Sequence, residues 1–209
     1  MSDPSDLGDM YDTTSVGNND DPITIENVYL LAVECIVYYL RWNNIIWIPP
    51  SNPEDLRLVV EYEYFTPDLG RALVHHCITN RILRLTVNAE FDVETWLQLT
   101  DVGGRRYVKR RFHRSLFMLP RHEDDNFRYL YPWAYACYLC FRAARCNRVT
   151  FIADIFDRLS KVMHARFGIS RHYYFLGRVA LVYNRYHESR HERSDDEGHI
   201  TDEEDDDAN

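Results

Sequence analysis

The chain has 209 residues, 45% of them hydrophobic, so it is long enough and apolar enough to form one domain with a real core. No stretch reaches the roughly 18 apolar residues that a membrane span requires. The five cysteines are an odd number and no secretory leader precedes them, so we expect a reducing compartment, the nucleus or the cytoplasm.

The net charge of −9 is unevenly distributed along the chain. Residues 1–21 carry −6 and residues 192–209 carry −9, which leaves +6 for residues 22–191. Acidic, apolar-poor segments cannot bury enough surface to fold alone. We therefore expect a folded domain over 22–191 between a disordered acidic lead (1–21) and a disordered acidic tail (192–209).

Capping residues followed by proline mark the first helices. Asp21-Pro22, Ser51-Asn52-Pro53 and Thr66-Pro67 each show this pattern. The helices predicted in this half are 23–42, 53–65, 67–85 and 92–99. The first is apolar nearly all round, as in a helix at the centre of a bundle. We expect an extended link over 87–91 and a turn at Gly103-Gly104.

The second half of the chain is also predicted to be helical. Val108, Phe112 and Leu116 recur at the spacing of one helix face, which predicts a helix through the basic stretch that begins at Arg105. Further helices are predicted over 133–146, 150–167 and 170–187. The fold class is therefore all-α: a single compact bundle of about seven to eight helices with disordered acidic ends.

The basic stretch is the densest positive cluster in the chain. It comprises Arg105, Arg106, Lys109, Arg110, Arg111 and Arg114. Such a row can neutralise nucleic-acid phosphates, with Tyr107 and Phe112 available to stack on bases and Arg57, Arg71, Arg81 and Arg84 extending the patch. It can equally be a nuclear import signal, a partner-binding face or a solvated helix face.

Two motifs resemble metal sites. His187-Glu188-Ser189-Arg190-His191 matches the zinc-protease pattern, but its flanks are polar on all sides. Cys137-x-x-Cys140 with Cys146 has the spacing of zinc ligands, but a continuous helix points Cys146 away and favours buried free thiols. No phosphate-binding glycine loop or nucleophile elbow is present. We expect no metal, no cofactor and no catalysis.

The acidic tail contains two kinase motifs. Ser194 and Thr201 each have an acidic residue three positions downstream, as the acidophilic kinase casein kinase 2 requires. Phosphorylation there would add negative charge to a tail that can compete for the basic stretch.

The segment Leu69-Gly70-Arg71-Ala72 resembles the Gly-Arg pair in the groove motif of Bcl-2-like proteins. Asp68-Leu69 stands where that family has Asn-Trp. The resemblance implies a helical bundle built around very apolar central helices, and a role as an apoptosis regulator.

These observations favour a non-enzymatic regulatory or adaptor protein that acts by binding other proteins. A nucleic-acid-binding protein that uses the 105–114 helix, gated by the acidic tail, is the alternative, and a Bcl-2-like regulator is a weaker one. Only two of the 24 Lys and Arg residues are lysines, and this bias with charged ends suits a viral accessory protein.

Overall fold

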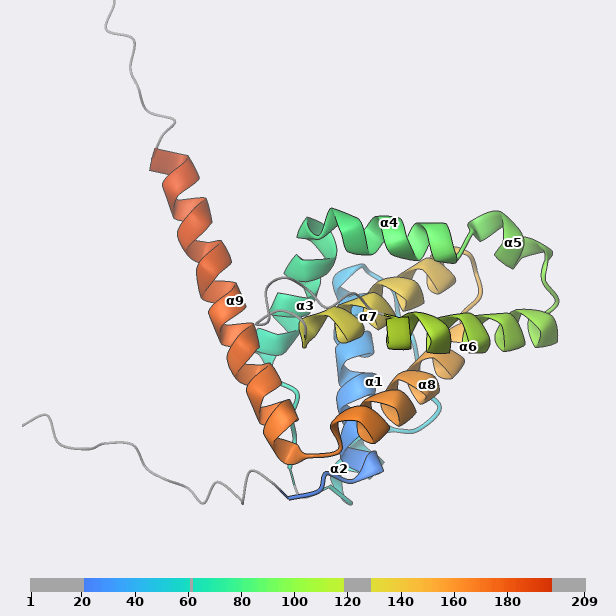
Figure 1. The fold of residues 1–209 in the computed structure, drawn as a ribbon, viewed down its shortest axis with the longest axis horizontal. Coiled ribbons are helices and arrows are strands. Elements are labelled where there is room, and N and C mark those ends of the chain that lie inside the picture. The colour runs from blue at the N-terminus through green and yellow to red at the C-terminus, as the bar shows by residue number, and fades with distance from the viewer. Residues whose placement is uncertain (1–20, 61, 119–128, 197–209) are drawn as a thin grey trace, which may run out of the picture.

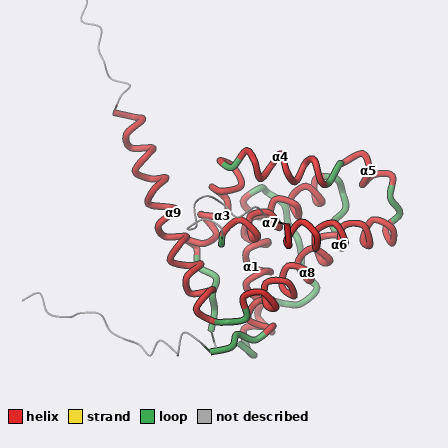
Figure 2. The backbone as a smooth tube through the Cα atoms, in the orientation of Figure 1, coloured by secondary structure: helices red, strands yellow, loops and turns green. Residues whose placement is uncertain are grey.

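A computed structural model of the chain describes residues 21–60, 62–118 and 129–196 (Figure 1). These residues form nine helices and no strand (Figure 2), apart from an isolated bridge between Pro22 and Ile169. The helices are α1 (Ile25–Trp42), α2 (Pro53–Arg57), α3 (Pro67–Thr79), α4 (Arg81–Glu90), α5 (Val93–Gln98), α6 (Asp101–Met118), α7 (Leu130–Arg145), α8 (Thr150–Phe167) and α9 (Ser170–Asp196). The predicted all-α class is confirmed.

The core is organised around α1 and α7, the two helices that are apolar on nearly every side. Every residue of α7 from Leu130 to Cys140 is buried, and so is every residue of α1 from Leu30 to Ile36. Helix α7 contacts α1, α3, α4, α8 and α9, so its buried stretch from Leu130 to Cys140 is enclosed on every side.

Capping explains where several helices begin. The Thr66 side chain accepts a hydrogen bond from the Leu69 amide at 3.1 Å, and the Asn52 side chain accepts one from Glu54 at 3.3 Å, as predicted. The first cap is different from the predicted one. Thr24, three residues after Asp21, caps α1.

Two predicted helices are shorter than expected. Helix α2 ends at Arg57, because the residues that follow, Leu58 and Val59, are exposed and bury no apolar face. The helix expected over 67–85 divides at Asn80, whose side chain accepts the Leu83 amide at 2.9 Å and so starts a new helix.

Two predicted breaks are helical in the structure. The expected extended link over 87–91 falls mostly in α4, because the buried Val87 continues the apolar face of Leu83 one turn later. The expected turn at Gly103-Gly104 lies inside α6. A Cβ on Gly104 would come within 2.3 Å of the Phe151 ring, so this glycine allows α6 to approach α8 closely.

Helix α9 packs along α3, and its carboxyl end projects away from the other helices (Figure 1). It continues to Asp196, past the expected end at His187 and into the first residues of the predicted acidic tail. The rest of that tail, and the predicted lead before Asp21, lie outside the described residues.

Candidate binding surfaces

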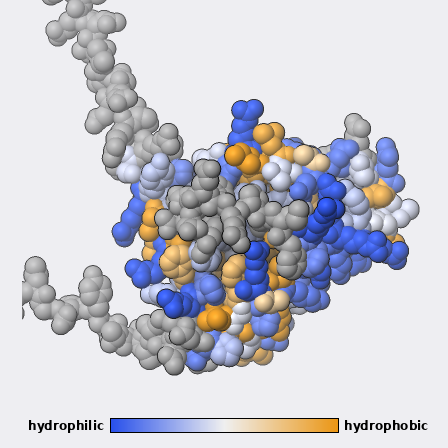
Figure 3. All heavy atoms as spheres, viewed as in Figure 1, coloured by the Kyte–Doolittle hydropathy of each residue, from blue (hydrophilic) through white to orange (hydrophobic). Residues whose placement is uncertain are grey.

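The basic stretch forms a helix, as predicted, and lies on α6. Val108, Phe112 and Leu116 are buried on the side of α6 that faces the core. Helix α6 packs mainly against α8, which fixes the opposite side toward solvent. Figure 3 shows hydrophilic residues gathered over this part of the molecule.

Two of the six predicted basic residues are neutralised by α8. The guanidinium of Arg105 donates to both carboxylate oxygens of Asp154, at 2.6 Å from Nε and 3.0 Å from Nη2. The ammonium of Lys109 lies 3.7 Å from Asp154 and 3.8 Å from Asp157. These two residues therefore help to hold α6 against α8.

The other four basic residues, Arg106, Arg110, Arg111 and Arg114, form what we call the arginine surface. All four are exposed, and they line a shallow depression of about 370 Å³ together with Gly103 and Tyr107. Among the described residues, no carboxylate forms an ion pair with any of the four. Their charge is therefore available to an anion.

The residues expected to support nucleic-acid binding contribute less than predicted. Phe112 is fully buried and stacks on Tyr135 with ring centroids 6.0 Å apart, so the prediction that it stacks on bases is wrong. Tyr107 is half-buried, and its hydroxyl donates to the Glu90 carbonyl at 3.3 Å. Burial, aided by Arg158, lowers the pKa of His113, which disfavours its charged form.

The arginines expected to extend the patch lie on other elements. Arg57 pairs with Glu34 and Glu54, Arg71 pairs with Asp68, and Arg84 donates to the Cys77 carbonyl. Arg81 is exposed at the start of α4. At least three of these four are thus occupied in local contacts.

The motifs that resemble metal sites lie apart in the fold. Cys137 and Cys140 are fully buried in α7, and burial raises the pKa of both thiols well above the usual range. Cys146 is half-buried at the end of the same helix. His187 packs on the ring of Tyr183 at 4.4 Å. In the described part of the chain, no group of three or more potential ligands is placed to hold a metal ion.

The predicted phosphorylation sites fall at the edge of the described residues. Ser194 belongs to the last turn of α9, and Thr201 lies outside the described residues.

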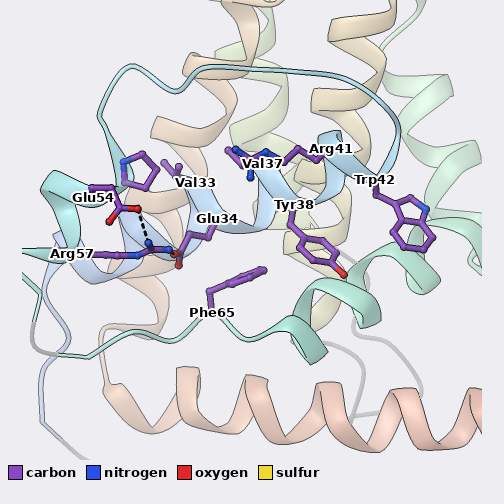
Figure 4. Close-up of a pocket in the computed structure, with 10 residues that line it drawn as sticks. Val33, Glu34, Val37, Tyr38, Arg41, Trp42, Glu54, Arg57 and Phe65 are labelled. Carbon is purple, nitrogen blue, oxygen red and sulfur yellow. Dashed lines mark hydrogen bonds and ion pairs between the residues drawn. The ribbon is translucent and has the colours of Figure 1, made fainter.

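A second surface, which sequence reasoning missed, is a groove between α1, α2 and the segment that precedes α3 (Figure 4). We call it the α1–α2 groove. Its volume is about 560 Å³. Its apolar lining consists of Val33, Val37, Tyr38, Trp42, Pro53 and Phe65. In Figure 4, Phe65 points toward α1, where its ring packs against that of Tyr38 with centroids 5.7 Å apart.

Charged side chains also line this groove: Arg41 on α1, and a cluster around Arg57 at one end. Arg57 Nη2 donates to Glu34 Oε1 at 2.5 Å, while Nη1 donates to Glu54 at 2.8 Å and Nε lies 3.6 Å from Glu63. Glu34 is only 8% exposed, and its other oxygen, Oε2, is buried with no hydrogen-bond partner among the residues that the structure describes. Burial raises the pKa of Glu34, against the opposing effect of Arg57.

Large apolar side chains are exposed on the segments that form the groove or continue directly from them in the chain. Trp42, at its other end, is 59% exposed, and Leu58, just after α2, is 85% exposed. The loop that connects α1 to α2 adds Ile46, which is 89% exposed. Isolated exposed apolar residues are ordinary, but several on neighbouring segments beside a groove are typical of an interaction surface.

The Gly-Arg pair that resembles the Bcl-2 motif, Gly70 and Arg71, lies on α3, where Gly70 packs against Tyr38 of the groove lining. A Cβ on Gly70 would come within 2.7 Å of the Tyr38 ring, so the glycine lets that groove-lining ring pack against α3. Arg71 is exposed and pairs with Asp68 on its own helix.

No protein-family model matches the chain, and no curated protein or solved structure matches it. The four-residue likeness to Bcl-2-like proteins therefore stays a prediction. Across the described helices, none combines the length and the apolar character needed to cross a membrane.

Proposed function

We propose that this protein is a non-enzymatic regulator that binds a partner protein, and that the α1–α2 groove receives an apolar segment of that partner. The observation that supports this most is the groove itself, with an apolar lining and exposed Trp42 and Leu58 at its edges. Grooves with aromatic and apolar walls and a few polar groups are the usual form of a recognition site.

The size of the exposed apolar area favours a protein over a small molecule. A small ligand inside the groove would leave Leu58, Val59 and the connecting loop in water. A partner segment that lies along the groove can cover them too, and burial of each large apolar side chain contributes about 1.5–3 kcal/mol.

Photo-crosslinking tests this proposal. A photoreactive residue is placed at Leu58, the residue after Arg57 of the groove, which is 85% exposed, and a control one at Ile82 on α4, an apolar position that is 68% exposed. We expect a discrete crosslinked partner only from position 58, and loss of binding between the purified pair when Val37 is replaced by Arg. Equal adducts from both positions, or undiminished binding by Val37→Arg, would refute the proposal.

The arginine surface supports a second candidate function, the binding of nucleic acid. Four exposed arginines on one helix, without carboxylate partners in the described chain, can contact successive phosphates. Its recognition would be mainly electrostatic, because Phe112 is buried and cannot stack on bases.

A salt series tests this second candidate. The full chain is titrated with labelled single- and double-stranded DNA, alongside a triple variant Arg106→Ala/Arg110→Ala/Arg114→Ala. The control variant Arg171→Ala/Arg178→Ala/Arg185→Ala removes the same charge from exposed positions of α9. Each lost phosphate contact should lower the logarithmic salt slope by about 0.9 on duplex DNA. Truncation after Asp196 should tighten binding if the acidic tail competes. Equal losses in both variants would argue against a specific surface.

A further inference from the structure

The arginine surface carries charge that the fold does not use. Arg105 and Lys109 already pair with the carboxylates of α8 and help to hold α6 in place. The four arginines of the surface are exposed, and their side chains make no hydrogen bond or ion pair with the described residues. Their guanidinium groups are therefore open to an anion from solution.

These four charges also repel one another. Arg106, Arg110 and Arg114 recur at every fourth position of α6, so each lies next to the following one on the helix surface. Like charges at this spacing destabilise a helix, and no described carboxylate pairs with them. A local cost that the fold leaves uncompensated is expected at a functional site rather than at a purely structural face.

The same four arginines line one hollow. They form a shallow depression of about 370 Å³ with Gly103 and Tyr107, and none of the described residues that line it is acidic. From Arg106 to Arg114, α6 advances by eight residues, or about 12 Å at 1.5 Å per residue. The unpaired positive charge is thus concentrated over a length close to that of one small molecule.

The carboxylate of Glu90, at the end of α4, does not neutralise this depression. The Tyr107 hydroxyl donates to the backbone carbonyl of Glu90 at 3.3 Å. The Glu90 carboxylate instead accepts hydrogen bonds from the hydroxyls of Ser115 and Tyr135. An anion can therefore enter the depression without breaking a hydrogen bond or ion pair of the described fold.

We propose that this depression binds a compact polyphosphate, a small molecule on which three or more phosphate groups are clustered. A guanidinium group holds a phosphate through two parallel N–H donors, so four of them suit several phosphates held close together. A long strand would present only a few phosphates to so short a patch, whereas a compact ligand presents most of its charge at once. The inference goes beyond the second candidate function, because it requires no nucleic acid.

Calorimetric titration of the full chain with inositol hexakisphosphate tests this proposal. Inorganic phosphate is the reference, and both titrations are run at the same ionic strength so that screening by salt is equal. Phosphates linked on one scaffold bind together once the first is held. We expect the dissociation constant of inositol hexakisphosphate to be at least about a hundredfold lower than that of inorganic phosphate.

One variant assigns the binding to α6. The triple change Arg106→Gln/Arg110→Gln/Arg114→Gln removes three charges from exposed positions and introduces residues that favour a helix. It should weaken the binding of inositol hexakisphosphate by at least about tenfold. The ligand should also raise the melting temperature of the unmodified protein, and the variant should lose that shift.

A matched variant controls for net charge. Arg171→Gln/Arg178→Gln/Arg185→Gln removes the same charge from exposed positions of α9 and should change the affinity by no more than about twofold. Equal loss in the two variants would overturn the inference, and so would inositol hexakisphosphate that binds no better than inorganic phosphate. Should the α6 triple variant fail to fold, the single change Arg110→Gln takes its place.

The outcomes separate this inference from the second candidate function. A labelled DNA strand is titrated into the same proteins. DNA binding through α6 without tight binding of inositol hexakisphosphate would overturn this inference and leave the nucleic-acid function in place. Tight binding of inositol hexakisphosphate that the α6 variant loses, with no DNA binding, would support this inference and remove that function. Binding of neither ligand would remove both.

Discussion

The carboxylate of Asp154 on α8 accepts two hydrogen bonds from the guanidinium of Arg105 on α6, at 2.6 and 3.0 Å. Asp154 is only 6% exposed, whereas Arg105 is 53% exposed. The buried carboxylate has lost most of its hydration and therefore needs the ion pair more than the guanidinium does. This contact divides the basic helix into a side that holds the fold together and a side, the arginine surface, that faces solvent.

Asp154→Asn should therefore have two opposite effects. Loss of the charged acceptor should lower the free energy of unfolding by about 1–2 kcal/mol, a value reduced from that of a fully buried pair because Arg105 is half-exposed. The same change frees Arg105, while Lys109 keeps its ion pair with Asp157, so DNA affinity should rise and its salt slope steepen. Urea unfolding and a DNA titration check both. A stability loss without any gain in affinity would show that α6 does not contact DNA.

Gly104→Ala and Gly177→Ala should change stability in opposite directions. A methyl group at position 104 would meet the Phe151 ring and force α6 from α8, which should destabilise the protein by about 1–3 kcal/mol. Position 177, within α9, has no atom within 4 Å of the added methyl group. There, alanine should stabilise the helix by up to about 1 kcal/mol. Thermal unfolding of both variants checks this, and equal effects would contradict the close packing of α6 on α8.

Thiol reactivity should separate the five cysteines. Cys35, Cys77, Cys137 and Cys140 are buried, and burial raises the pKa of Cys77 to about 12. A thiol reagent needs the exposed thiolate. With the native protein, we expect fast reaction only at Cys146, which is half-buried, and reaction of all five in denaturant. Cys146→Ser should abolish the fast phase. Rapid labelling of any α7 thiol in the native state would contradict the packed core.

The stability of the protein should depend on Glu34 in mildly acidic solution. Burial raises the pKa of Glu34 in the folded chain, so between its ordinary pKa and the raised one the folded state binds more proton than the unfolded state. The free energy of unfolding should therefore fall as pH rises through this window. Glu34→Gln should remove that contribution while keeping an acceptor for Arg57. Urea unfolding across the acidic to neutral range compares the two proteins, and identical pH profiles would count against a desolvated carboxylate.

The sequence predicted those parts of the fold that depend on local chemistry. Thr66 and Asn52 cap helices because their side chains reach amides two or three residues away. Both all-round apolar helices are central, as expected from their composition. Gly103-Gly104 was misassigned as a turn because the reason for Gly104 is Phe151, a residue 47 positions later in the chain.

The groove was not predictable in the same way. Its walls come from α1, α2 and the segment before α3, and nothing in the residue spacing shows that these meet. One signal was present: Glu34 interrupts an otherwise apolar run in α1. A single charge inside a central helix indicates either a buried partner or a site, and in the structure Glu34 pairs with Arg57.

Helix α1 has two roles, since it forms the floor of the groove and also packs against α3, α7 and α8 in the core. A partner held in the groove would bind the folded state alone, and its binding free energy would add to that of folding. The abundance of the partner in the cell would then set the lifetime of this protein, because a chain without its partner unfolds and is degraded more often.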